Sequence, residues 1–236
     1  MQAASNFPNK TLTGISSMAT RAVLADLIGA YAKATGNSIA IESVGGVDAA
    51  KRVQAGEAFD AVFLAADAID KLIASGHVLV GSRVDLMRSG VSVAVRKGAV
   101  QPSIATEAAL MATVLAASSI GYSTGPSGVA LIKLFERWGI APQIQSRLVQ
   151  ATPGVPVGSM VANGTVALGF QQTSELLNLP GIAILGPLPE SVQIVTTFSA
   201  GVCATSQDAA TVQELLAYMA GPDCADAKRR QGMEPA

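Results

Sequence analysis

The sequence predicts an α/β protein made of two Rossmann-like lobes that are joined by two crossover strands. Short apolar runs alternate with segments of helical periodicity along nearly the whole chain, which is the pattern of repeated β-α-β units. Half of the 236 residues are hydrophobic and only 14% are charged, which is enough apolar material for one large core or two modest ones. Aromatic residues make up only 4%, while Ala, Val, Gly and Ser are abundant, as in parallel strands covered by helices.

Three β-α units are predicted at the start of the chain. Each apolar run ends in Ser, Gly or Ala, and a segment of helical periodicity follows at once. We expect Ser16 and Ser17 to cap the first helix and Gly36 to end it. The predicted strands cover residues 12–15, 39–43 and 61–65, and the predicted helices begin near residues 16, 47 and 67.

Two long apolar runs predict the strands that connect the lobes. The run 86–95 is too long for an ordinary buried strand and contains an arginine and two serines, as a strand crossing between lobes would. The run 193–204 mirrors it and leads into two helices that we expect to pack back on the first lobe. The predicted lobe one therefore comprises residues 1–87 and 198–236, and lobe two comprises residues 88–197, with a ligand cleft between them.

A second series of β-α units is predicted between the two crossings. A Ser-Thr-Gly-Pro-Ser-Gly loop at residues 123–128 joins one of its strands to the following helix. The predicted strands are 120–122, 147–150 and 166–170, and the predicted helices are 106–117, one that ends near residue 138, and 157–162.

Charge, hydropathy and cysteine content exclude several kinds of protein. The net charge is −1 and the basic residues are scattered, which argues against nucleic-acid binding. No apolar run reaches the roughly 18 residues that a membrane span needs. Cys203 and Cys224 are too few for a disulfide framework and form either one bridge or two separate thiols. Residues 1–5 are not a secretory signal, but Ala-rich residues there are what a removed signal would leave, so we expect a mature periplasmic protein.

The carboxyl ends of the predicted strands carry the candidate ligand site. In open α/β sheets, ligands bind outside these ends, where helix N-termini direct free N–H groups at them. Three ends are rich in Gly and hydroxyl residues, namely 14–18, 43–46 and 123–128. One such segment alone is more often structural, but their recurrence at three ends favours a site. Small residues, hydroxyls and helix dipoles together favour a small anionic ligand such as an oxyanion or carboxylate.

Two charged residues are further candidates. Arg88 lies in an apolar strand and needs a partner, which is either a ligand carboxylate bound by its planar guanidinium or a nearby acidic side chain. Glu175 follows the strand end at Phe170 and is either a capping acid or a base beside the ligand.

The remaining motifs argue against several chemistries. His77 is the only histidine and lies at a helix end, where a capping role is more common than catalysis. One histidine and no acidic cluster predict no metal site. The Gly-rich segments match neither the dinucleotide fingerprint nor the phosphate loop, and Ser127 lacks the spacing of a hydrolase nucleophile.

Three segments occur in a characteristic order: Ser-Ser-Met-Ala at 16–19, residues 51–56 followed by 59–63, and Gly-Phe-Gln-Gln at 169–172. In these segments the chain resembles the type II periplasmic solute-binding proteins, specifically the molybdate-binding-like branch. The resemblance covers nearly the whole chain. It implies two α/β lobes, two crossover strands and a cleft that closes on its ligand by hinge bending.

The branch contains both transport receptors and exported enzymes, the aconitate isomerases. Gly45 and Gly46 stand where molybdate binders have a Ser-rich segment, and Arg88 stands where they use neutral donors, so the resemblance favours a tricarboxylate. It implies a 1,3 proton shift that interconverts trans- and cis-aconitate and requires no cofactor. The alternative is a receptor that delivers a small carboxylate or an oxyanion such as molybdate to a membrane permease.

For the proton shift, Ser17 and Glu175 are the candidate catalytic residues, and Asp67 is a further possible base by position. Arg88 and the helix N–H groups would stabilise the charge that develops on the adjacent carboxylate. The candidate substrate-binding residues, all near strand ends, helix starts or the crossing, are Ser16, Ser17, Met18, Gly45, Gly46, Ala66, Arg88, Ser89, Ser123, Thr124, Ser127, Gly128, Pro153 and Gln171.

Overall fold

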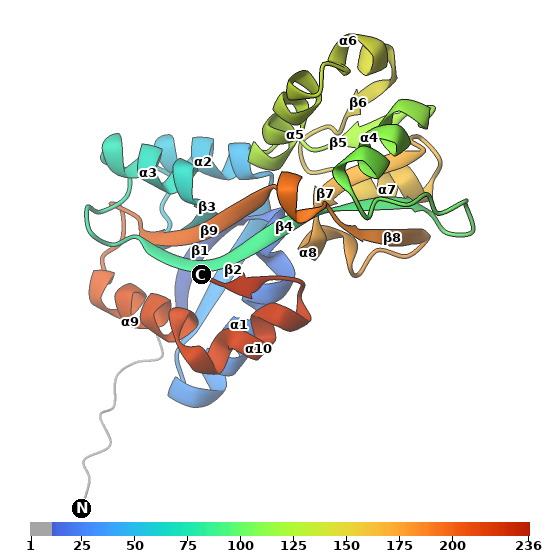
Figure 1. Cartoon of the computed structure of the whole chain (residues 1–236). Coiled ribbons are helices and arrows are strands. Elements are labelled where there is room, and N and C mark those ends of the chain that lie inside the picture. The colour runs from blue at the N-terminus through green and yellow to red at the C-terminus, as the bar shows by residue number, and fades with distance from the viewer. Residues whose placement is uncertain (1–10) are drawn as a thin grey trace, which may run out of the picture.

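A computed structural model describes residues 11–236, in which ten strands form a single mixed sheet that carries helices on both faces (Figure 1). The strand order is β2-β1-β3-β9-β4-β7-β5-β6, and β8 and β10 pair with β4. The expected remnant of an export signal falls in residues 1–5, outside the described residues. Within the described range, no helix is long and apolar enough to cross a bilayer.

The bounds of the elements follow the predicted alternation of strands and helices. The strands are β1 (Thr11–Ser17), β2 (Ser38–Val44), β3 (Ala61–Ala65), β4 (Val84–Arg96), β5 (Ile120–Tyr122), β6 (Leu148–Gln150), β7 (Leu168–Gln172), β8 (Ile182–Pro187), β9 (Val195–Val202) and β10 (Glu234–Pro235). The helices are α1 (Arg21–Thr35), α2 (Gly46–Gln54), α3 (Ala66–Ala74), α4 (Glu107–Ala116), α5 (Pro126–Arg137), α6 (Ala141–Ile144), α7 (Val157–Ala162), α8 (Thr173–Leu176), α9 (Ala209–Ala220) and α10 (Ala225–Arg230).

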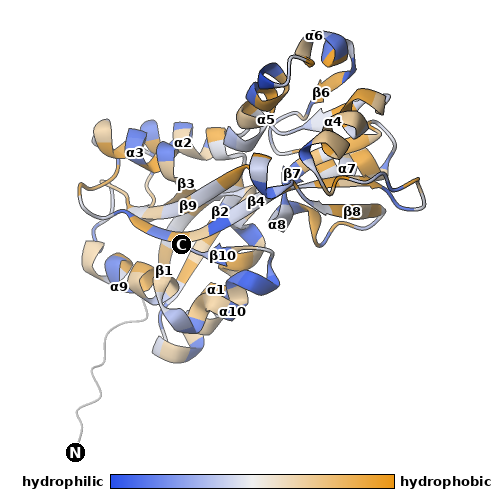
Figure 2. Ribbon diagram, in the orientation of Figure 1, coloured by the Kyte–Doolittle hydropathy of each residue, from blue (hydrophilic) through white to orange (hydrophobic). Residues whose placement is uncertain are grey.

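Lobe one is built on the parallel strands β2, β1 and β3, with β9 antiparallel beside β3. Successive side chains of a strand point to opposite faces, so Phe63 packs with α1, α9 and α10, while Val62 and Leu64 pack with α2 and α3. Figure 2 shows hydrophilic and hydrophobic residues along α2 and α3, as expected of helices that cover a sheet with one side. The two C-terminal helices pack on lobe one, as predicted.

Strand β4 belongs to both lobes. Its first half, up to Gly90, pairs with β9, and its second half, from Val91, pairs with β7 and β8. The Gln193 side chain accepts hydrogen bonds from the backbone N–H groups of Val91 and Ile194, at 3.1 and 2.8 Å. The two connections between the lobes are therefore fastened to each other at the point where the chain crosses.

Lobe two is built on the parallel strands β7, β5 and β6. Helices α4, α5 and α6 cover one face through a core that includes Phe135 and Phe170, and α7 covers the other. Helix α7 approaches β7 so closely that a Cβ at Gly169 would overlap the Val161 side chain. This close packing fixes α7 against β7.

The structure corrects the predicted start of α1 and the bounds of β7, and it confirms the predicted end of α1. Ser16 and Ser17 end β1 and do not cap α1 through their side chains, because a short 3-10 turn at Met18–Thr20 intervenes before α1. Strand β7 begins two residues later than predicted, at Leu168, and β8 and β10 were not predicted. Gly36 ends α1 in the left-handed conformation that was expected of it (φ 79°).

Candidate functional site

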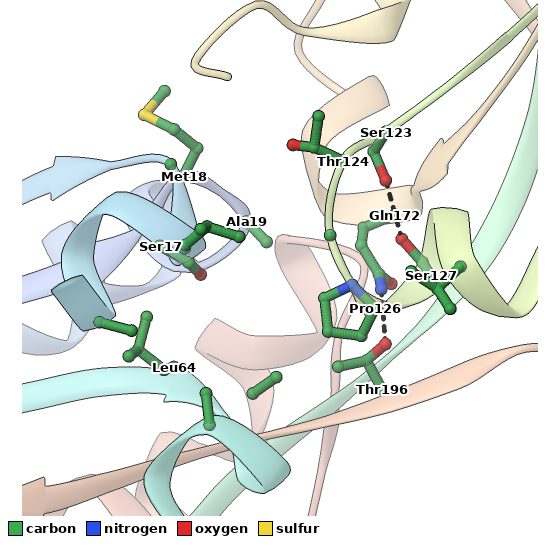
Figure 3. Close-up of a pocket in the computed structure, with 18 of the residues that line it drawn as sticks. Ser17, Met18, Ala19, Leu64, Ser123, Thr124, Pro126, Ser127, Gln172 and Thr196 are labelled. Atoms are coloured by element: carbon green, nitrogen blue, oxygen red, sulfur yellow. Dashed lines mark hydrogen bonds between the residues drawn. The ribbon is translucent and has the colours of Figure 1, made fainter. Parts of the chain in front are cut away.

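A cleft of about 700 Å³ lies between the lobes and is lined from both sides. In Figure 3, Ser17, Met18 and Ala19 form one wall, and Ser123, Thr124 and Ser127 face them from the other. This volume falls within the range typical of small-molecule sites, and it exceeds what a single small anion would fill. The two lobes therefore have room to close around a ligand.

Helix starts surround this cleft. Helices α2, α3, α5, α7 and α8 all begin at it, and the five residues that precede them line it, namely Gly45, Ala65, Gly125, Pro156 and Gln172. None of these residues forms a side-chain cap, so the first N–H groups of the helices have no side-chain acceptor from the N-cap position. Uncapped helix starts attract anions, and the longer helices α2, α3 and α5 contribute most through their dipoles.

Ser17 supplies a free hydroxyl group on the lobe-one wall. Within residues 11–236, its Oγ is the only buried side-chain nitrogen or oxygen that lacks a hydrogen-bond partner. The neighbouring Ser16 hydroxyl is instead bonded to Ser43 at 2.8 Å. An unpaired buried hydroxyl costs free energy in the empty protein, and a ligand oxygen would remove that cost.

Glu175 lies in the first turn of α8 and is one of the residues that line the cleft. Burial raises the pKa of Glu175 from its ordinary value to about 7, and a hydrogen bond with Gln171 opposes this rise. The Gln171 side-chain oxygen accepts from the Gly158 N–H at 3.1 Å, which fixes the amide group beside the carboxyl. At neutral pH, Glu175 can therefore both accept and release a proton.

Helix α8 belongs to lobe two by sequence but is anchored to lobe one. The Ser174 hydroxyl donates to the Ala19 carbonyl at 3.0 Å, and the Asn178 amide donates to Gln231 at 3.2 Å. These contacts tie the segment that carries Glu175 to lobe one. Glu175 belongs to lobe two by sequence and Ser17 belongs to lobe one. The hydrogen bond between Ser174 and Ala19 connects the two segments that carry them.

Polar pairs line the rest of the cleft. Ser123 and Ser127 are bonded to each other at 3.1 Å on the lobe-two wall. At the crossing, the Gln172 amide lies 2.8 Å from the Thr196 hydroxyl. Both pairs are drawn in Figure 3, and both present groups that can donate to an anion or accept from a ligand hydroxyl.

The structure brings most predicted site residues together at the cleft. Those that line it are Ser17, Met18, Gly45, Gly46, Ser123, Thr124, Ser127, Gln171 and Glu175. Asp67 also lines it, but its carboxylate pairs with Lys71 at 3.6 Å. Those outside the lining are Ser16, Ala66, Arg88, Ser89, Gly128 and Pro153.

Arg88 corrects the expectation that it binds the ligand. Its side chain is exposed and does not line the cleft, because Met87 and Ser89 are the buried neighbours and a strand alternates its faces. Its Nε and Nη2 atoms donate to the Pro235 carbonyl at 3.3 and 3.1 Å. The partner that the structure shows is thus the backbone of β10, and not the acidic side chain that was the alternative.

Several cleft residues were missed from the sequence, among them Lys51, Lys133 and Thr196. Lys51 on α2 and Lys133 on α5 lie on the same helix faces as residues at the helix starts, so helical spacing was the signal that could have found them. Thr196 has no such signal, because its position depends on where β9 crosses. In the described part of the chain, no three His, Cys, Asp or Glu side chains gather as a metal site would require.

The chain belongs to the bacterial extracellular solute-binding protein family, whose sequence model matches residues 12–234. Within that family it is a homologue of aconitate isomerase. It is 38% identical over 234 residues to the aconitate isomerase of a Pseudomonas species, which covers 97% of this chain and 89% of the relative.

Solved structures show the same fold. The periplasmic molybdate-binding protein of Azotobacter vinelandii matches with a TM-score of 0.77 at 21% identity, over 94% of this chain and 98% of that protein. The sulfate-binding protein SubI of Mycobacterium tuberculosis matches with a TM-score of 0.77 at 13% identity, over 96% of this chain and 87% of that protein. The predicted α/β fold with two lobes and the resemblance to type II periplasmic binding proteins are confirmed.

Proposed function

We propose that the protein is an aconitate isomerase, which interconverts trans- and cis-aconitate in the cleft by a 1,3 proton shift. The observation that carries this proposal is Glu175, a carboxyl group with a pKa of about 7 at a cleft that attracts anions. A receptor needs no such proton carrier, whereas an allylic isomerase requires one near neutrality. The 38% identical aconitate isomerase supports the same reaction.

In the proposed reaction, the Glu175 carboxylate takes a proton from the methylene carbon of bound trans-aconitate. The electron pair of the broken C–H bond spreads over the allylic system and into the adjacent carboxylate. Helix N–H groups and the Ser17 hydroxyl stabilise this charge, because the residues that carry them already line the cleft before it develops. The protonated Glu175 then returns the proton to the far end of the allylic system, which shifts the double bond and leaves the enzyme unchanged.

Two further features belong to this proposal. Closure of the lobes would exclude water and hold the carbon beside Glu175. The site of action would be the periplasm, which is supported by membership of an extracellular family and by the periplasmic molybdate-binding neighbour.

The second candidate is a receptor that hands a small carboxylate or oxyanion to a permease. It is favoured by the solved neighbours that bind molybdate and sulfate. The two candidates share the cleft and differ in whether the ligand loses a proton.

The deciding experiment incubates purified protein with trans-aconitate in D2O and follows both cis-aconitate and deuterium incorporation by NMR. We expect turnover and exchange in the wild type, and a loss of at least about 100-fold of both in Glu175→Gln. Glu190→Gln, a change outside the cleft lining, is the control. Binding of trans-aconitate with neither turnover nor exchange would exclude the enzyme and leave the receptor.

A further inference from the structure

We propose that Lys51 and Lys133 bind the ligand carboxylate that lies farthest from the helix starts, and that they thereby select tricarboxylates over dicarboxylates. This inference rests on the proposed function and concerns two residues that the proton shift itself does not use. The lysines come from opposite lobes, so the same contact would also draw the lobes together.

Helical geometry places Lys51 in the cleft. The cleft-lining residues of α2 are Gly46, Val47, Ala50, Lys51 and Gln54, which follow the spacing of one helix face. Lys51 is five positions after Gly46, which is about 7.5 Å along the axis at 1.5 Å per residue. The Cα atom of Lys51 therefore lies more than one helical turn beyond the N–H groups at the start of the helix.

Lys133 occupies the corresponding position on the other lobe. The cleft-lining residues of α5 are Pro126, Ser127, Val129, Ala130 and Lys133, again along one helix face. Both walls of the cleft thus have the same order along the helix, with an uncapped start followed by a lysine one to two turns further along.

The charges of these two lysines are uncompensated by the protein. Neither ammonium group forms an ion pair or hydrogen bond with another residue in the range 11–236, whereas that of the third cleft lysine, Lys71, pairs with Asp67 at 3.6 Å. The remaining cleft acid is Glu175, whose raised pKa leaves it partly neutral. The part of the cleft around Lys51 and Lys133 is therefore cationic, which favours a second anionic group on the ligand.

Two separate anion-binding zones match one class of ligand. The inner zone consists of the helix starts and the unpaired Ser17 hydroxyl, and the outer zone consists of Lys51 and Lys133. A single tetrahedral oxyanion is too small to contact both zones. Aconitate can contact both zones: the two carboxylates on its double bond bind at the helix starts and the hydroxyl pair of lobe two, and the carboxylate of its carboxymethyl arm reaches the lysines.

The test compares trans-aconitate with mesaconate, which has a methyl group in place of the carboxymethyl group, by isothermal titration calorimetry. We expect Lys51→Gln and Lys133→Gln each to weaken binding of trans-aconitate about tenfold, and to leave the affinity for mesaconate unchanged. Lys97→Gln, an exposed lysine outside the cleft lining, is the matched control and should behave as the wild type.

The outcomes separate this inference from the proposed function. If wild-type protein isomerises trans-aconitate but the lysine variants keep its full affinity, or lose affinity for both ligands equally, the role of the lysines is wrong and the enzyme stands. If the wild type binds neither ligand, both proposals fail. Addition of 0.5 M NaCl should reproduce the selective loss in the wild type, because exposed ammonium groups are screened by salt.

Discussion

Glu175 links the stability of the empty protein to pH. Its pKa is about 7 in the folded protein, against 4.5 for an ordinary glutamate, so the folded state holds this proton more tightly than the unfolded state. The stabilisation is complete below about 4.5 and is lost as the pH rises through about 7. Glu175→Gln should therefore stabilise the protein at pH 8 by roughly 3 kcal/mol and have little effect at pH 4.

Thermal unfolding of both proteins at the two pH values measures this difference. The same carboxyl group predicts that kcat/KM increases with pH up to about 7 and then levels off, because a base acts in its deprotonated form. A stability difference independent of pH would mean that folding does not raise the pKa of Glu175.

The Ser17 hydroxyl is expected to lower the stability of the empty protein and to increase its affinity for the ligand. Because its hydroxyl has no partner within the described structure, Ser17→Ala should leave the melting temperature unchanged or slightly higher. Affinity for trans-aconitate should decrease about tenfold, since a hydrogen bond to a charged group is worth roughly 1.5–3 kcal/mol at most. Ser16→Ala serves as a contrast, because that hydroxyl is bonded to Ser43 and its removal should lower stability. Calorimetric titration and thermal melts measure the two effects.

At the scale of elements, the start of α5 depends on a glycine. A Cβ at Gly128 would overlap the Ser123 carbonyl oxygen, so Gly128→Ala must displace the loop that carries the lobe-two wall of the cleft. We expect a loss of about 2–4 kcal/mol in stability, together with loss of ligand binding. Gly125→Ala, three residues earlier, meets no atom within 4 Å and should keep the fold. Urea unfolding measures the stability of both variants. An equal loss of stability in the two would contradict this account.

The accuracy of the sequence predictions follows from what fixes each element. Strand β3 and helix α7 lie at the predicted residues, because a buried strand and a covering helix both leave strong apolar patterns. Strand β8 was missed because its residues are half-buried, which leaves no clear alternation. Cleft residues at strand ends were predictable, since the carboxyl ends of parallel strands meet at one edge.

Arg88 shows why other features of the site could not be predicted from the sequence. The register of β4 against β9 shifts between Asp85 and Met87, and both Leu86 and Met87 are buried. Such an irregularity changes which face the following residues occupy, and no residue type marks it. The partner of Arg88 also lies 147 positions away, at Pro235, in a strand of two residues that only tertiary packing creates.

For the whole molecule, exposed valines at the cleft predict how the lobes close. Val47 of lobe one and Val129 and Val155 of lobe two line the cleft and are 47%, 53% and 43% exposed. Closure would bring these apolar side chains together and bury them, which adds up to about 1 kcal/mol for each. Val129→Ser should therefore weaken ligand binding about threefold to fivefold and reduce the ligand-induced compaction seen by small-angle X-ray scattering. Val80→Ser, 86% exposed and outside the cleft lining, should change neither quantity.

The two cysteines give lobe one its own reporter of unfolding. Cys203 and Cys224 are free and buried in the two cores of lobe one, and the chain contains no others, so lobe two has none. Burial raises the pKa of the Cys203 thiol to about 12, which keeps it unreactive until its surroundings open. The rate of cysteine alkylation during denaturation would therefore report the unfolding of lobe one. The fluorescence of Trp138 would report the unfolding of lobe two. If alkylation of the cysteines and the fluorescence of Trp138 change together, the shared strand β4 makes the lobes unfold as one cooperative unit.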